Sequence, residues 1–106
     1  MDIPERDWKY LRRIKTEMLE TLCKRINDEA SRIANDASGS QHDKYLRLFK
    51  HVMDQDDIVG NCFNDWRRSN IIMHLSWISR EQLLTPEHLS HLTEETPNRI
   101  EALREL

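Results

Sequence analysis

Glycine, proline and cysteine are scarce in this sequence, and no long apolar run occurs in it. Only two glycines and three prolines interrupt 106 residues. A sheet would need many turns, so the scarcity of breakers favours helices. Apolar residues make up 38% of the chain and charged residues 33%, against about 45–50% and about 25% in average globular proteins. We therefore expect one all-α domain with a modest core, either elongated or completed by a second subunit.

The two cysteines, Cys23 and Cys62, stand far apart and form no CxxC motif. They occupy helical apolar positions, as reduced and buried thiols of a cytoplasmic protein would. The first nine residues, MDIPERDWK, are polar and acidic, which predicts no signal peptide. Because no apolar run approaches the length of about 18 residues that a span requires, we expect no membrane partner.

Basic residues are not in excess. The net charge is −3, from 16 lysines and arginines and 19 aspartates and glutamates. Residues 81–106 hold six glutamates against two arginines. Such a carboxyl-terminal part repels phosphate, so we expect no nucleic-acid partner.

Apolar residues recur every three or four positions from Asp2 to about Ala37, which predicts one long helix. Asp2 and Glu5 have the spacing of a capping box, and Pro4 fits a first turn. A helix on the order of 50 Å long cannot bury its stripe against the remaining residues folded as a ball. It should pair with a second copy or stand out as an arm. The residues expected to dimerise are Leu11, Met18, Leu22, Ile26 and Ile33.

Ser38-Gly39-Ser40 predicts the end of this helix, with Gly39 in a left-handed conformation and Ser40 as the next N-cap. We expect a second helix over 41–53 with Tyr45, Leu48, Phe49 and Val52 on one side, an acidic hinge over 54–57 and a third helix over 58–80. Thr85-Pro86 and Thr96-Pro97 each predict the start of a short helix. The single domain then divides into an extended dimerisation part, 1–53, and a compact helical head, 54–106.

Residues that could support chemistry are isolated from the groups they would need. His88 and His91 have a workable zinc spacing but no matched third ligand. His51 with Asp43 or Asp54 could form a general-base pair, yet no nucleophile or oxyanion loop accompanies it. We expect a protein that is not an enzyme and has no cofactor. The alternative left open is a small-molecule or metal-binding helical protein that uses His88, His91 or a pocket beside Trp77.

The stretch FNDWRRSNII, from Phe63 to Ile72, places a tryptophan among charged groups. On a continuous helix, Asp65 would reach Arg68, and Trp66, Asn70, Met73 and Trp77 would form one stripe flanked by Arg67 and Arg68. Tryptophan, methionine and arginine are enriched at protein interfaces. The pattern favours an interface, either with a partner or with a second copy, over a core within one chain.

Several stretches of the carboxyl-terminal part line up, without gaps over about forty residues, with one known family. They are DWRRSNII at 65–72, Glu81 with Leu83 and Leu84, Leu89 with Leu92, and IEALREL at 100–106. In this order they resemble the fluorescence recovery protein family of cyanobacteria. The resemblance implies an all-helical protein that dimerises through long helices and has a compact helical head. It also implies a non-enzymatic regulator that binds the photoactivated orange carotenoid protein and speeds its return to the resting form.

The sequence departs from that family where the family contacts its partner. Members carry a Trp-x-x-His-Asp run and then an arginine, whereas this chain has Leu48-Phe49-Lys50-His51-Val52 followed by three aspartates. The contacts of the head would fall on Met73 and Arg99. We therefore expect a homodimeric regulatory or adaptor protein whose partner is another protein, a carotenoid-binding protein being one possibility. The residues expected to bind it are Phe49, Lys50, His51, Trp66, Arg67, Arg68, Met73, Trp77 and Arg99.

Overall fold

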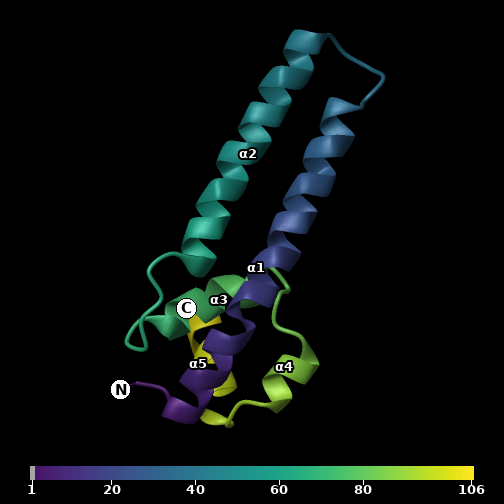
Figure 1. Ribbon diagram of the computed structural model, residues 1–106. Helices are drawn as coiled ribbons and strands as arrows, with labels where there is room; N and C mark the ends of the chain where they lie inside the picture. The colour runs from purple at the N-terminus through teal and green to yellow at the C-terminus, as the bar shows by residue number, and fades with distance from the viewer. Residues whose placement is uncertain (1) are drawn as a thin grey trace.

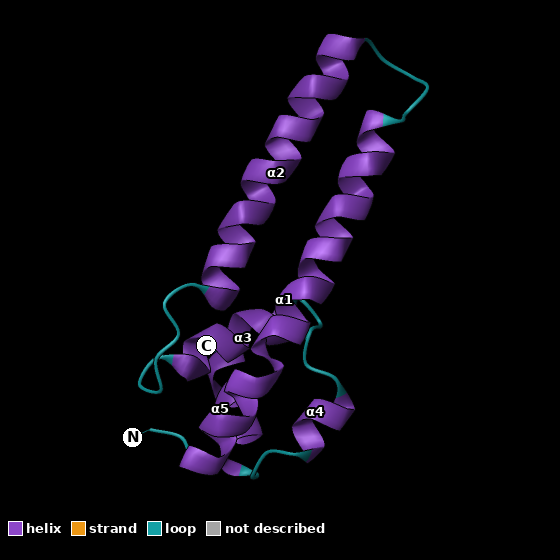
Figure 2. Ribbon diagram, viewed as in Figure 1, coloured by secondary structure: helices purple, strands orange, loops and turns teal. Residues whose placement is uncertain are grey.

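The computed structural model describes residues 2–106 and confirms the all-helical prediction, since five helices and no strand are found over that range (Figures 1 and 2). The helices are α1 (Glu5–Ala34), α2 (Gln41–Phe63), α3 (Ile71–Arg80), α4 (Pro86–Ser90) and α5 (Glu95–Arg104). The molecule measures 52 × 25 × 23 Å. Along the described chain, no helix has the length and apolar character needed to cross a bilayer.

The first two helices run antiparallel, side by side, and project from the other three (Figure 1). The turn between them forms as the sequence predicts. Gly39 has a φ of 84°, a left-handed conformation that glycine adopts without strain. The Ser40 hydroxyl accepts a hydrogen bond from the Asp43 amide at 3.0 Å and caps α2. Asp36 reinforces the turn, because its carboxylate accepts from Ser38 at 3.0 Å and from Arg47 at 3.1 Å.

The predicted acidic hinge is wrong, because 54–57 lies inside α2, which continues to Phe63. Lys50 pairs with Asp54 at 2.8 Å across one turn, so the acidic stretch is an exposed part of the helix. The chain bends instead between α2 and α3, where Asp65 adopts a φ of 59°. A third helix over 58–80 is therefore wrong too, and the division at 53/54 falls within a helix.

Helix ends differ from their predictions in two further places. Pro4 is the N-cap of α1 with no side-chain cap, so the predicted Asp2–Glu5 capping box is wrong. Thr85 does cap α4, and the His88 side chain completes a capping box with it. Thr96, however, lies within the first turn of α5, because that helix begins at Glu95.

The core gathers the inward stripe of α1 with the end of α2 and one face each of α3 and α5. Its buried residues are Ile3, Leu11, Ile14, Met18, Leu22, Cys62, Phe63, Ile71, Leu75, Ile78, Leu83, Leu92 and Ile100. Four of the residues expected to dimerise are thus buried within a single chain: Leu11, Met18, Leu22 and Ile33. The prediction that they face a second copy is wrong, because α2 and the head already cover them. Ile26 is half-buried and packs against the same core.

Burial separates the molecule into two parts, which we call the arm and the head. The arm comprises residues 24–61, which are the far end of α1, the turn and nearly all of α2, and Ile33 alone is buried there. The head comprises the other described residues and holds the core. Polar contacts anchor α1 in the head. The buried Asp7 carboxylate accepts from Thr93 Oγ1 at 2.7 Å and from the Thr96 hydroxyl, and Arg25 Nη1 donates to the Glu81 carbonyl at 2.7 Å.

Candidate interaction surfaces

The FNDWRRSNII stretch is a loop with a short following helix, and the predicted Trp66–Trp77 stripe is therefore wrong. Trp66 is half-buried, and its Nε1 donates to the Cys62 carbonyl at 2.8 Å. Asp65 pairs with Arg67 at 2.8 Å instead of Arg68. Arg68 Nε donates to the Ile3 carbonyl at 2.9 Å, so this guanidinium fastens the chain's beginning to the loop. Of the two arginines, Arg67 is the one left exposed to a partner.

The other residues expected to bind a partner are spread over the molecule. Met73 is 51% exposed on α3. Trp77 is half-buried, with the Arg80 guanidinium 5.1 Å from its ring centroid. Arg99 on α5 is half-buried, and its Nη1 is a buried atom without a hydrogen-bond partner among the described residues. The structure does not bring these three together with the middle of α2.

On α2, the predicted Phe49–His51 stretch divides between two sides of the helix. Phe49 is 56% exposed on the outer side. His51 points toward α1, where its Nε2 lies 3.0 Å from the Ile26 carbonyl. Lys50 is exposed and pairs with Asp54. Only part of the stretch is thus available to a partner.

Phe49 belongs to an exposed apolar row that we call the apolar stripe of α2. Its members follow the spacing i, i+1, i+4, i+7, i+8, which places them on one face of the helix. They are Tyr45, Leu46, Phe49, Val52 and Met53, each between 49% and 62% exposed. The sequence pattern placed Tyr45, Phe49 and Val52 on one side with Leu48, and Leu48 is half-buried at the edge of the stripe. Five adjacent exposed apolar side chains are unusual on the surface of a single chain.

A second surface, which we call the basic face of α1, covers the amino-terminal half of that helix. Five cations occur within ten residues, and the single acid among them, Asp7, is buried in the head. The five are Arg6, Lys9, Arg12, Arg13 and Lys15. A net-charge count over the whole first helix misses this face, because acids at other positions of the same helix cancel its charge in the sum.

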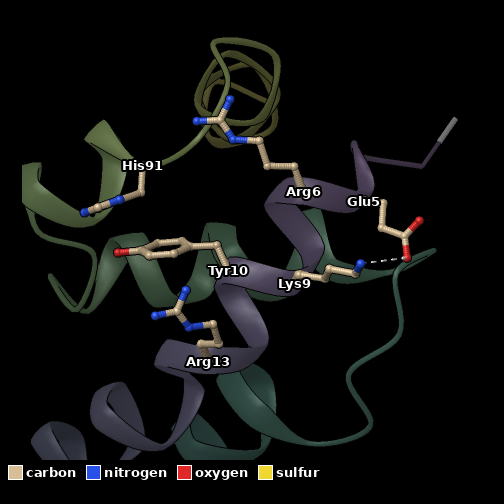
Figure 3. Close-up of a pocket in the computed structure, with 6 residues that line it drawn as sticks. All are labelled: Glu5, Arg6, Lys9, Tyr10, Arg13 and His91. Carbon is tan, nitrogen blue, oxygen red and sulfur yellow. Dashed lines mark ion pairs between the residues drawn. The ribbon is translucent and has the colours of Figure 1, made fainter.

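A shallow pocket of about 600 Å³ opens on this face (Figure 3). The Tyr10 ring lies between Arg6 and Arg13, and His91 from the end of α4 faces its hydroxyl end (Figure 3). The Tyr10 and His91 rings are stacked, with centroids 4.8 Å apart. Lys9 points away from the ring and toward Glu5, 3.9 Å distant (Figure 3).

The two histidines considered for zinc are engaged separately. His88 accepts from the Thr85 amide through Nδ1, so its proton is on Nε2, which lies 3.1 Å from Glu17 Oε2. His91 stacks on Tyr10. Over residues 2–106, no three histidine, cysteine or acidic side chains are placed to hold a metal ion.

Cys62 is the buried one of the two free thiols and lies in the core. Burial, and then the charge of Glu81, raises the pKa of the Cys62 thiol to about 11. A thiol that keeps its proton at neutral pH is a poor nucleophile. A small hollow of about 160 Å³ beside α3 and α5 is lined by Leu84, Leu89 and Ile100 among others, and not by Trp77.

Comparisons of this chain with protein-family models, with curated proteins and with solved structures find no match. The resemblance to the fluorescence recovery protein family stays a prediction.

Proposed function

We propose that this chain is a non-catalytic helical protein that forms a homodimer through the apolar stripe of α2 and acts as a regulator or adaptor by binding another protein. The observation that carries the proposal is the stripe itself. Monomeric proteins rarely expose a contiguous apolar patch unless it binds something. The arm that bears the stripe has one buried residue, Ile33, so it gains most from a second subunit.

Symmetry of the stripe supports a second copy as its occupant. Phe49 stands at its centre, with Tyr45 and Leu46 on one side and Val52 and Met53 at matching distances on the other. An antiparallel pair of α2 helices about a two-fold axis at Phe49 brings each half of the stripe against the other half. Two hairpins joined in this way make a four-helix arrangement, which is a common solution for helical dimers.

Charge at the ends of the stripe supports the same pairing. His42 and Asp56 lie seven residues before and after Phe49, close to two helical turns, so both continue the stripe. Both side chains are exposed, and neither makes an ion pair within residues 2–106. Antiparallel pairing places each His42 opposite the partner's Asp56, where the imidazole can donate to the carboxylate.

Sedimentation equilibrium tests the dimer. We expect wild-type protein to be dimeric at micromolar concentration, and Phe49→Glu to be monomeric with unchanged helix content by circular dichroism. Met73→Glu is the matched control, because Met73 is equally exposed but lies in the head; it should remain dimeric. A wild-type protein that stays monomeric at about 100 µM, well above the micromolar affinities of ordinary assemblies, would contradict the dimer.

A charge exchange tests the register. His42→Asp should weaken the dimer, since it brings two aspartates together, and adding Asp56→His should restore it. If the double variant is no tighter than His42→Asp alone, the pairing about Phe49 is wrong.

The partner is tested with a pull-down in which Arg67→Glu serves as the variant, because Arg67 is exposed and pairs only with Asp65. The resemblance makes the photoactivated orange carotenoid protein the first partner to try. Since the acidic Asp54–Asp57 stretch replaces the family's arginine, we expect no acceleration of its recovery, and an acceleration would instead assign the family's function to this chain.

A further inference from the structure

We infer that the basic face of α1 is a docking site for a short acidic segment of a partner protein. The inference rests on the proposed function, because it supplies the chemistry of the protein that would be bound. The face is separate from the apolar stripe of α2, since it lies on the other long helix and at the head.

The cations of this face have few partners of their own. Lys9 is the only one of the five that makes an ion pair within residues 2–106, and that pair is long, at 3.9 Å. The one acid between Arg6 and Lys15 is Asp7, whose carboxylate is turned inward to Thr93 and Thr96. Four of the five cations, Arg6, Arg12, Arg13 and Lys15, are therefore free of ion pairs within residues 2–106.

Two of these cations, Arg12 and Lys15, pack over aromatic rings. The Arg12 guanidinium lies 5.9 Å from the centroid of Trp8, and Lys15 Nζ lies 5.0 Å from that of Trp66. A cationic side chain that already packs against an aromatic ring loses less conformational entropy when it binds an anion. Trp66, which the sequence assigned to a partner site, thus adjoins this face.

Three neighbouring hollows lie along the cations. The pocket at Tyr10 shares Lys9 and Arg13 with a second hollow of about 370 Å³, and the second shares Arg12 with a third of about 190 Å³. The charges run from position 6 to position 15, about 13 Å along the helix. That length matches about four residues of extended chain at about 3.3 Å each, and it is much longer than one phosphate group.

The surroundings favour acidic peptide over nucleic acid or a small molecule. Glu5, Glu17 and Glu87 border the face, so a phosphate chain running beyond it would meet like charge. Arg6, Arg13 and His91 are exposed, whereas small-molecule pockets bury most of their ligand. Burial, followed by the charges of Glu87 and Glu17, raises the pKa of Tyr10, so its phenol stays protonated and can donate to a carboxylate.

Fluorescence anisotropy tests the site with a labelled peptide of four consecutive glutamates between glycines. The same peptide with four glutamines and a twelve-nucleotide strand of thymidine are measured beside it. We expect the glutamate peptide to bind, the glutamine peptide not to bind, and the oligonucleotide to bind less tightly than the glutamate peptide.

Charge reversal locates the binding. The double variant Arg6→Glu, Arg13→Glu should weaken binding of the glutamate peptide by roughly tenfold, because two exposed ion pairs become repulsions. The control, Lys24→Glu with Arg32→Glu, makes the same change in net charge at exposed positions farther along α1 and should bind almost as wild type. If the first variant loses helix content, Arg13→Gln must still weaken binding by a few-fold.

The contrary outcomes are distinct. Equal binding of the glutamate and glutamine peptides, or equal weakening by both double variants, overturns the inference. Tighter binding of the oligonucleotide with the same dependence on Arg6 and Arg13 makes the face a nucleic-acid site and also overturns it. Monomeric Phe49→Glu should bind the peptide as wild type does. If the wild-type protein is monomeric and binds the peptide, only the proposed dimer is wrong. If it is dimeric and does not bind the peptide, only this inference is wrong.

Discussion

The arm and the head share the long helix α1 but are held by different forces. In the head, α1 and α2 meet α3 and α5 around thirteen buried apolar residues. In the arm, the same helices have Ile33 as their one buried residue, and their outer side exposes the apolar stripe. A helix can thus be part of a packed core along one half of its length and depend on a neighbour along the other.

The arm has little burial to hold it, and the ion pairs on its surface add only weak stabilisation. Exposed ion pairs across one turn join Lys24 to Asp28 and Lys50 to Asp54, each at 2.8 Å. Such pairs are worth about 0.3–0.5 kcal/mol each on a helix, whereas burying one leucine is worth about 1.5–3 kcal/mol. The arm of a single chain therefore opens more readily than the head.

The largest expected effect comes from removing one leucine side chain in each part. Leu75→Ala in the head should lower the free energy of unfolding by about 2–5 kcal/mol, because it leaves a cavity at a fully buried position. Leu46→Ala, at a side chain 49% exposed in the arm, should change it by less than about 1 kcal/mol. Urea denaturation in the monomeric Phe49→Glu background measures both, and similar losses would abolish the distinction between arm and head.

A smaller effect is expected at Asp7. The Asp7 carboxylate is buried and accepts hydrogen bonds from the Thr93 amide and from the hydroxyls of Thr93 and Thr96. Asp7→Asn replaces one of its oxygens with an NH2 group, which is a donor and cannot accept from them. We expect a loss of about 1.5–3 kcal/mol, the range for hydrogen bonds to charged groups. Asp57→Asn, on the exposed side of the arm, is the control and should cost almost nothing in the same urea titration.

The smallest effect is expected at the tip of the arm. Hydrogen bonds from Ser38, and then one from Arg47, lower the pKa of Asp36 from its usual 3.8 to about 2. A folded-state pKa below the unfolded one stabilises the fold above about pH 4, and this contribution is lost as the pH falls toward 2. Asp36→Asn should therefore slightly lower the thermal midpoint at pH 7. A difference from wild type that did not shrink between pH 4 and pH 2 would show that the charge of Asp36 is not involved.

The parts of the fold that depend on neighbouring residues could be predicted from the sequence. Gly39 and Ser40 fix the turn at the tip, and Thr85 with Pro86 begins α4, because each uses a conformation or cap available within a few residues. The regular spacing of Leu11, Met18 and Leu22 likewise predicted α1. The same spacing could not tell which surface would cover the stripe, and it was the chain's own α2 and head.

The position of the bend was missed because two signals competed. Three aspartates at 54–57 suggested a hinge, but aspartate is tolerated on an exposed helix face, and Asp54 pairs with Lys50 there. Asn64 and Asp65 were the better signal, since both favour turns and Asp65 tolerates a positive φ. Moving the bend by ten residues placed Trp66 beside Trp8, with ring centroids 6.3 Å apart, and away from Trp77. The basic face could not be predicted because it depends on Asp7 turning inward.

The unbroken α1 has a mechanical consequence. One helix of 30 residues carries the basic face at its first half and ends at the tip of the arm (Figure 1), and it contains no glycine or proline at which it could kink. It can therefore act as a stiff lever with its fulcrum near Arg25, where the guanidinium holds the carbonyls of Glu81 and Gln82. We expect a displacement of the arm to be transmitted along this helix to its end in the head.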